Sequence, residues 1–213
     1  NGQITGTPSI YTTVTNYTVT VNDQAAQTSS RTFSLVVTPP ALTATLVIPS
    51  STFIRGVTIT SINPVTVVGG YTPYTFTIAP ALPSGLIFVP ETGRLAGKAT
   101  ISSVATVYTI TVTDSQNNTV ERNYTLTVND PPILTTIQNV ATVNLIRYTS
   151  VANVAPVGAS GGQGTISFSI TPALPSGLTF SSSNGKITGT PTQLVNQVYT
   201  VTATDSVGQF SNT

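Results

Sequence analysis

The side chains that could carry out acid–base chemistry are few and regularly spaced. The chain of 213 residues has six Asp and Glu residues and no His or Cys, which excludes imidazole and thiol chemistry. Catalysis by paired carboxylates would need two of them in one cleft. Asp23, Asp114 and Asp205 follow similar segments at a step of 91 residues (114 minus 23, and 205 minus 114). Equivalent residues of a repeat fall in separate modules, so we predict that each carboxylate caps a turn at a strand end and that the chain is not an enzyme.

The second chemistry open to carboxylates is calcium binding. The candidate ligands are Asn129 and Asp130, which precede two prolines, together with Asp114 from the same stretch of chain. Calcium takes about six to eight oxygen ligands, several of them charged. One Asp and one Asn at the junction are too few, and the equivalent junction at residues 37–40 has no carboxylate. The favoured prediction is a stiff Pro-Pro connector without a cofactor, with calcium as the alternative.

An internal repeat positions these residues. Residues 81–86 (ALPSGL) return letter for letter at residues 173–178, which is 92 positions later (173 minus 81). A chain that repeats itself every 90 or so residues is an array of one module. The register predicts the C-terminal half of a module at 1–38, a complete module at 39–130, and at 131–213 a module that lacks its last strand.

The pattern of apolar residues predicts strands throughout. In residues 108–113 (YTITVT) apolar side chains fall on one face and threonines on the other, which is typical of a half-buried strand. The chain has 15 Pro and 16 Gly at short intervals, as expected between short strands. Asn184-Gly185 predicts a two-residue hairpin turn. About seven strands per module indicate an all-β fold of tandem immunoglobulin-like β-sandwiches.

The ordered motifs resemble a known family. Leu-Pro-Ser-Gly-Leu is followed by Gly-x-(Ile/Leu)-x-Gly at residues 93–97 and 185–189, and then by the strand that ends in Asp114 or Asp205. This order is similar to the bacterial putative-Ig repeat, a relative of the cadherin-like domains of dystroglycan type, over nearly the whole chain. The resemblance implies tandem Ig-like sandwiches on large secreted or cell-surface proteins, without catalytic residues.

Composition narrows the partners. Charged residues make up 6% of the chain and the net charge is +1, so the clustered Lys and Arg that nucleic acid needs are missing. No apolar run is long enough to predict a membrane span. A surface with little charge gives little repulsion between copies and favours self-association, unless sugars cover it. Asn16, Asn117 and Asn123 stand in the acceptor pattern for glycosylation, although such tripeptides are expected by chance in a chain rich in Asn and Thr.

Two tyrosines are specific to one module. Tyr71 and Tyr74 are replaced in the second copy of the repeat by Gln163 and Ile166. Most other aromatic residues recur in the period of strands, which favours a role in the core. Tyr71 and Tyr74 are therefore the candidates for a surface that contacts sugars.

These observations lead to two functional hypotheses. The first is a structural, non-catalytic segment of an extracellular surface protein, appendage or filament, whose modules act as spacers and bind other copies or further repeats. Phe33, Leu35 and Val37 alternate on a strand equivalent to the one missing at residues 131–213, and an open sheet edge invites strand addition. One copy could complete the next head to tail; the alternative is that the chain is a piece of a longer one. The second hypothesis is an adhesive or carbohydrate-binding module of a secreted or cell-surface protein.

Overall fold

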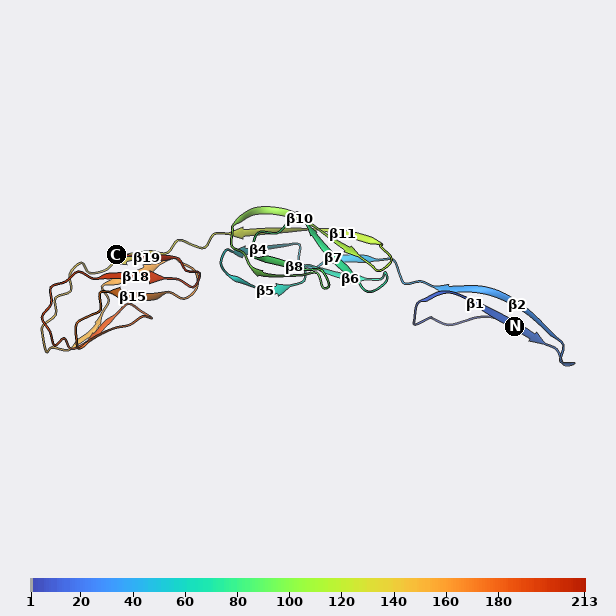
Figure 1. Cartoon of the computed structure of the whole chain (residues 1–213), viewed down its shortest axis with the longest axis horizontal. Helices are drawn as coiled ribbons and strands as arrows, with labels where there is room; N and C mark the ends of the chain where they lie inside the picture. The colour runs from blue at the N-terminus through green and yellow to red at the C-terminus, as the bar shows by residue number, and fades with distance from the viewer. Residues whose placement is uncertain (1) are drawn as a thin grey trace.

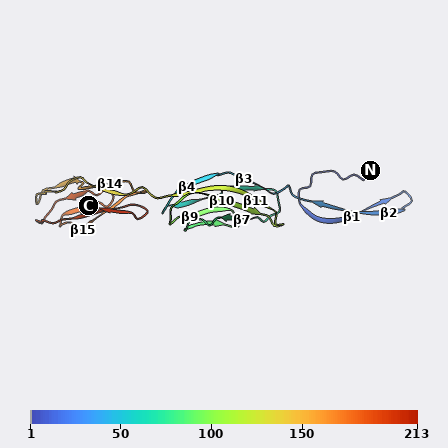
Figure 2. The same cartoon turned by 90° about the horizontal axis from the view of Figure 1, so that it is seen from above.

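The computed structural model describes residues 2–213, and every regular element in that range is a β-strand. Figures 1 and 2 show three parts that follow one another lengthwise: an N-terminal hairpin, a central sandwich and a C-terminal sandwich. The prediction of an all-β fold is confirmed. No helix in the described range is long and apolar enough to cross a membrane.

The N-terminal hairpin consists of β1 (Thr12–Asn22) and β2 (Thr28–Val37), paired antiparallel. The rings of Tyr17 and Phe33, opposite each other in the register, stack with centroids 5.7 Å apart. Its apolar side chains have no second sheet to pack against, so 44% of Tyr17 and 37% of Leu35 stay exposed. A lone two-stranded hairpin is marginally stable in water.

Module 1, residues 39–130, is a β-sandwich. Its strands are β3 (Thr43–Leu46), β4 (Ser50–Ile54), β5 (Thr58–Ile62), β6 (Val65–Val68), β7 (Thr75–Ala79), β8 (Leu86–Val89), β9 (Arg94–Lys98), β10 (Ser103–Thr113) and β11 (Thr119–Asn129). They form the sheets β4-β11-β10-β7, β5-β9-β8 and β3-β6. Module 1 has nine strands, more than the seven or so expected, and several of them are only four or five residues long.

Strand β11 is the centre of the large sheet. It pairs parallel with β4 on one edge and antiparallel with β10 on the other. Period-two alternation turns Tyr124, Leu126 and Val128 into the core, where at most 1% of each is exposed. The opposite face carries Thr125 and Thr127, as the sequence pattern predicts.

Module 2, residues 131–213, repeats the arrangement with shorter strands. They are β12 (Thr135–Gln138), β13 (Val151–Val154), β14 (Val157–Ser160), β15 (Ser167–Thr171), β16 (Leu178–Phe180), β17 (Ile187–Gly189), β18 (Thr200–Thr204) and β19 (Phe210–Asn212). The sheets are β15-β18-β19, β13-β17-β16 and β12-β14. β19 corresponds to the beginning of β11, whereas residues 142–146 and 194–199, the counterparts of β4 and of the first half of β10, form no strand.

The predicted two-residue turn at Asn184-Gly185 is wrong. The loop closes between Ser181 and Lys186, and the Gly185 amide donates to the Ser181 carbonyl at 2.9 Å. Gly185 has a φ of 67°, but Asn184 does not share the positive φ that a type I′ turn requires. The glycine packs beneath the Phe168 ring, where an added Cβ would lie 3.2 Å from the ring carbon Cδ1. Tertiary packing therefore selects the longer loop.

Candidate functional site: the junctions between modules

The carboxylates of the repeat cap turns. One oxygen of Asp114, Oδ1, accepts hydrogen bonds from the backbone amides of Gln116 and Asn118, each at 2.9 Å. Asp23 and Asp205 accept from the amides two and four residues ahead in the same way. The prediction that these residues close turns at strand ends is confirmed.

The second oxygen of Asp114 makes a contact that the sequence analysis missed. Its Oδ2 accepts from the Tyr71 amide at 3.0 Å and from Asn118 Nδ2 at 2.9 Å. A Cβ on Gly70 would lie 2.9 Å from this oxygen, so the loop can approach the carboxylate only with glycine there. The Asp114 side chain thereby ties the loop that follows β6 to the end of β10.

The same clamp is built in module 2. Asp205 Oδ2 accepts from the Gln163 amide at 2.8 Å and from Gln209 Nε2 at 2.9 Å. The recurring Gly-Gly pairs, at 69–70 and 161–162, were the sequence signal that could have revealed it. The N-terminal hairpin has the Asp but not the Gly-Gly loop.

Both clamp carboxylates stay ionised well into the acid range. Burial by itself would raise the pKa of Asp114, but the hydrogen bonds from Asn118, Tyr71 and Gln116 outweigh it and hold the pKa below its usual value. Burial and hydrogen bonds oppose each other in the same way at Asp205, whose pKa is also lowered. These carboxylates are structural acceptors, and their oxygens are occupied by protein donors.

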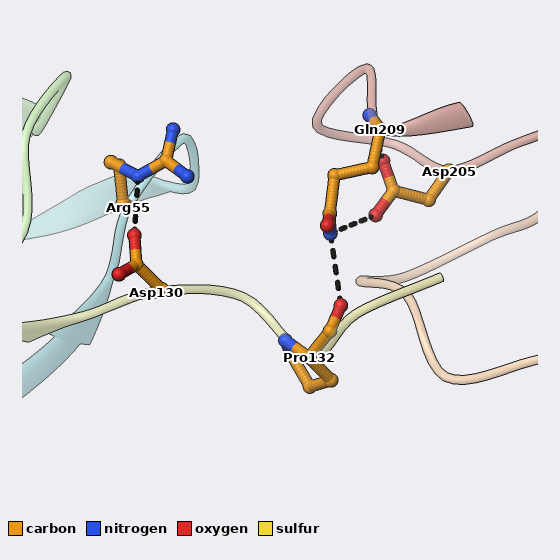
Figure 3. A network of polar contacts seen from close by, with 5 residues as sticks. All are labelled: Arg55, Asp130, Pro132, Asp205 and Gln209. Carbon is orange, nitrogen blue, oxygen red and sulfur yellow. Dashed lines mark hydrogen bonds and ion pairs between the residues drawn. The ribbon is translucent and has the colours of Figure 1, made fainter. Parts of the chain in front are cut away.

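The junction between the modules is held from both sides (Figure 3). From module 1, Arg55 Nε donates to Asp130 Oδ1 at 2.7 Å. From module 2, Gln209 Nε2 donates to the Pro132 carbonyl at 2.9 Å while it also binds Asp205. The hydrogen bond from Arg55 lowers the pKa of Asp130. The two linker residues on either side of Pro131 are thus each held by one module, Asp130 by module 1 and Pro132 by module 2.

The bodies of the modules also approach each other beside the linker. A Cβ on Gly56, in the turn after β4, would lie 3.1 Å from the Cβ of Val207 in module 2. At the earlier junction the Gly70 amide donates to the Pro40 carbonyl at 2.8 Å, and the Tyr11 and Tyr71 rings meet edge to face at 6.1 Å. Each Pro-Pro connector is therefore hydrogen-bonded to the module that follows it. Pro40 accepts from Gly70 of the Gly-Gly loop, and Pro132 accepts from Gln209, which also binds Asp205.

The three calcium candidates are not brought together. Asp114 follows the end of β10 that pairs Thr113 with Thr119, whereas Asn129 is the last residue of β11 and Asp130 follows it, at the opposite end of that antiparallel pair. The grouping of Asp114 with the other two is therefore wrong, because antiparallel strands of eleven residues separate them. Within residues 2–213 no three His, Cys, Asp or Glu side chains are grouped as metal ligands would be.

The remaining candidates lie at the surface or half buried. Tyr74 is half buried against the module 1 core and its hydroxyl donates to the Gly69 carbonyl, while Tyr71 is half buried beside Tyr11. Asn16, Asn117 and Asn123 are exposed. The proposals of sugar attachment and of a contact surface at Tyr71 and Tyr74 stay predictions.

β-Sandwiches in tandem, joined by a short proline linker, define an array of immunoglobulin-like modules. The chain belongs to the family described as Putative Ig domain, whose model matches residues 39–129 and 131–213.

Known relatives include bacterial proteins that are named as adhesins. The chain is 30% identical over 132 residues to the "Serine-rich adhesin for platelets" of Staphylococcus aureus strain MRSA252, a match that covers 62% of this chain and 10% of the adhesin. A second adhesin of that name from Staphylococcus aureus is 31% identical over 134 residues, with 62% and 6% covered. The chain thus spans a tenth or less of the length of these curated relatives.

Among solved structures, protocadherins show a distant likeness. Protocadherin Gamma B7 extracellular cadherin domains 1-4 give a TM-score of 0.38 at 11% identity, covering 97% of this chain and 64% of that one. Human Protocadherin-24 EC1-2 gives 0.34 at 16% identity, covering 81% and 93%.

We expect Asp114→Asn to destabilise module 1. The amide would direct an NH₂ group at two donors, the Tyr71 amide and Asn118, so the midpoint of thermal unfolding should fall by about 5–10 °C. Glu121→Gln, which removes a charge from an exposed side chain of β11, is the control and should leave the midpoint nearly unchanged. Calorimetry at neutral pH checks both, and equal midpoints would contradict the role of the clamp.

The free energy of unfolding of the wild-type chain should decrease at acid pH. The pKa of Asp114 is lower in the folded than in the unfolded chain, so its contribution to stability is complete above the ordinary Asp pKa of about 3.9. It is lost as the pH falls through the lower folded value. In Asp114→Asn the loss of stability as the pH falls below about 4 should be smaller than in the wild type.

Proposed function

We propose that the chain is a non-catalytic structural segment of an extracellular or cell-surface protein, in which the modules act as spacers and associate with other copies. The single observation that carries the spacer role is the junction at residues 129–132, where Arg55 holds Asp130 and Gln209 holds the Pro132 carbonyl. A proline linker fixed at both ends transmits orientation from one module to the next.

The hydrogen bonds that the carboxylates accept from protein donors support a non-catalytic role. Both oxygens of Asp114 and of Asp205 accept hydrogen bonds from backbone or side-chain amides, and one oxygen of Asp130 accepts from the Arg55 guanidinium. Acid–base catalysis needs a carboxyl group that can reach a substrate proton. Carboxylates with lowered pKa values that hold turns and linkers fit a scaffold.

Exposed apolar surface supports self-association. In module 1, which is complete, Val68, Ile87 and Val104 remain 65%, 60% and 82% exposed. Few charges oppose the approach of a second copy, since the net charge is +1. The surface location draws its support from the family and from relatives named as adhesins.

Adhesion is the second candidate function, favoured by the name of these relatives. The contact surface for adhesion would lie near Tyr71, a tyrosine that is replaced by Gln163 in module 2. A surface glycan that stacks on the tyrosine ring is the partner that this side chain suits.

Loss of the Arg55–Asp130 contact should loosen the junction. With spin labels on cysteines at exposed Thr92 and Ser183, one per module, we expect Arg55→Gln to broaden the distance distribution measured by double electron–electron resonance. The natural chain has no Cys to interfere. About 1 M salt should broaden the wild type in the same direction, because an exposed ion pair is screened.

Arg147→Gln is the matched control for that experiment. Arg147 is the repeat equivalent of Arg55, but its guanidinium lies 4.8 Å from the centre of the Tyr148 ring. The control should keep the narrow distribution. If the Arg55→Gln variant gives a distance distribution as narrow as that of the wild type, the result would count against the stiff spacer.

Self-association should be visible in sedimentation velocity. As the concentration rises from about 1 μM to 1 mM, we expect species heavier than the 22.0 kDa single chain. A chain that stays single over this range would remove self-association from the proposed function and leave the spacer role to be judged by the spin-label distances.

The adhesive candidate predicts a local effect. Tyr71→Ala should abolish retention on immobilised surface glycans, whereas Tyr148→Ala, at a tyrosine that is 67% exposed in module 2, should not. Retention that survives Tyr71→Ala would place any adhesive surface elsewhere.

A further inference from the structure

The outer face of the β5-β9-β8 sheet of module 1 carries apolar side chains that no other element covers. Period-two alternation turns Leu95 into the core, where it is fully buried, and leaves Arg94 and Ala96 on the outside. Across the ladder Ile87 pairs with Ala96 and Val89 pairs with Arg94, so these four side chains share one face. The face belongs to module 1, between the other two parts of the chain (Figure 1).

This face combines a projection with a recess. The Ile87 side chain is apolar and yet 60% exposed. A shallow depression of about 350 Å³ lies on the same face, and its lining residues are Ser61, Val89, Thr92, Arg94 and Ala96. A projection and a recess on one surface are self-complementary when two copies face each other across a two-fold axis.

The tip of the β8–β9 hairpin adds one charge of each sign. Glu91 and Arg94 are both exposed, and neither forms a salt bridge with any of residues 2–213. The tip is anchored to the sandwich, because the Pro90 carbonyl accepts a hydrogen bond from the Phe76 amide at 2.7 Å. An anion and a cation are therefore held three positions apart beside the apolar surface.

Module 2 has a polar version of the same face. The three apolar positions have counterparts at the offset of 92, which are Thr179, Ser181 and Thr188. The anion is absent as well, since Ser183 stands in place of Glu91, and only the cation is kept, as Lys186. The sandwich does not need the apolar version, because Leu95 and its counterpart Ile187 are buried in both modules.

We propose that two copies of the chain bind each other through one face of module 1. This hairpin face consists of Ile87, Val89, Glu91, Arg94 and Ala96. Each Ile87 enters the recess of the other copy, and each Glu91 pairs with the Arg94 of the other copy. The proposal rests on the self-association in the proposed function and names its surface. Since module 2 carries the polar version, the chains associate module 1 to module 1.

Charge selects the direction of the pair. Arg94 and Lys98 stand two positions to either side of Ala96 on β9. An antiparallel pair centred on Ala96 would set each Arg94 beside the Lys98 of the other copy, and like charges repel. In a parallel pair the two hairpin tips lie together, so Glu91 faces Arg94. The apolar contacts supply the affinity and the ion pairs the register, because exposed ion pairs contribute little.

Charge reversal in the full chain tests the reciprocal contact. Arg94→Glu places two anions at each tip, and Glu91→Arg places two cations there. In sedimentation velocity each variant alone should associate at least about 10-fold more weakly than the wild type, whereas an equimolar mixture of the two should regain the association of the wild type. Only the parallel arrangement predicts this recovery. Lys186→Glu, the matched control in module 2, should associate like the wild type.

The apolar projection is tested by Ile87→Thr, which installs the residue of module 2. We expect association to weaken at least about 10-fold, because the recess of the other copy loses its apolar occupant. Val68→Ser is the matched control, since it exchanges another exposed apolar residue of module 1 for the module 2 counterpart, Ser160. The control should associate like the wild type, and circular dichroism verifies that both variants keep their strands.

The outcomes separate this surface from the proposed function. A wild-type chain that stays single from about 1 μM to 1 mM overturns both self-association and the hairpin face. Association that Arg94→Glu and Ile87→Thr both leave unchanged overturns the hairpin face and leaves self-association standing. Association that each charge variant loses and their mixture does not regain overturns the reciprocal contact. Recovery in the mixture, together with the loss in Ile87→Thr, supports the proposal.

Discussion

The sandwich depends on one strand that is paired on both edges and buried on one face. In module 1 that strand is β11, between β4 and β10. Burying a large apolar side chain contributes about 1.5–3 kcal/mol, and Tyr124, Leu126 and Val128 are all fully or almost fully buried. Both flanking strands also obtain their ladder partners from β11. In module 2 the described residues end within the counterpart of β11, and the residues equivalent to β4 and to the first half of β10 form no strand.

The clamps act at the ends of the strands. Asp114 and Asp205 fasten a Gly-Gly loop to a strand end at the edge of the module where the preceding linker arrives. In module 2 the same Gln209 that supports the clamp also holds the Pro132 carbonyl. The stability of a module and the orientation of its linker are therefore coupled through a few hydrogen bonds.

Strands and repeat register were predictable from sequence because both depend on local alternation and on letter-for-letter recurrence. The turn role of Asp114 was predictable as well, since its partners Gln116 and Asn118 are neighbours in the chain. The bond of Asp114 to Tyr71 was not, because it crosses 43 residues of sequence. The calcium grouping failed for the same reason: distance along an antiparallel pair of strands decides which residues meet. The prediction of a two-residue turn at Asn184-Gly185 was wrong because the Phe168 ring, distant in sequence, packs on Gly185 and favours the longer loop.

The same alternating strand pattern occurs in the hairpin, in module 1 and in module 2. Its apolar face is completely buried only in module 1. Tyr17 in the hairpin and Tyr108 in module 1 occupy equivalent positions, yet 44% of the first and 3% of the second are exposed. Alternation therefore encodes a strand, while burial requires the complementary half of the sandwich.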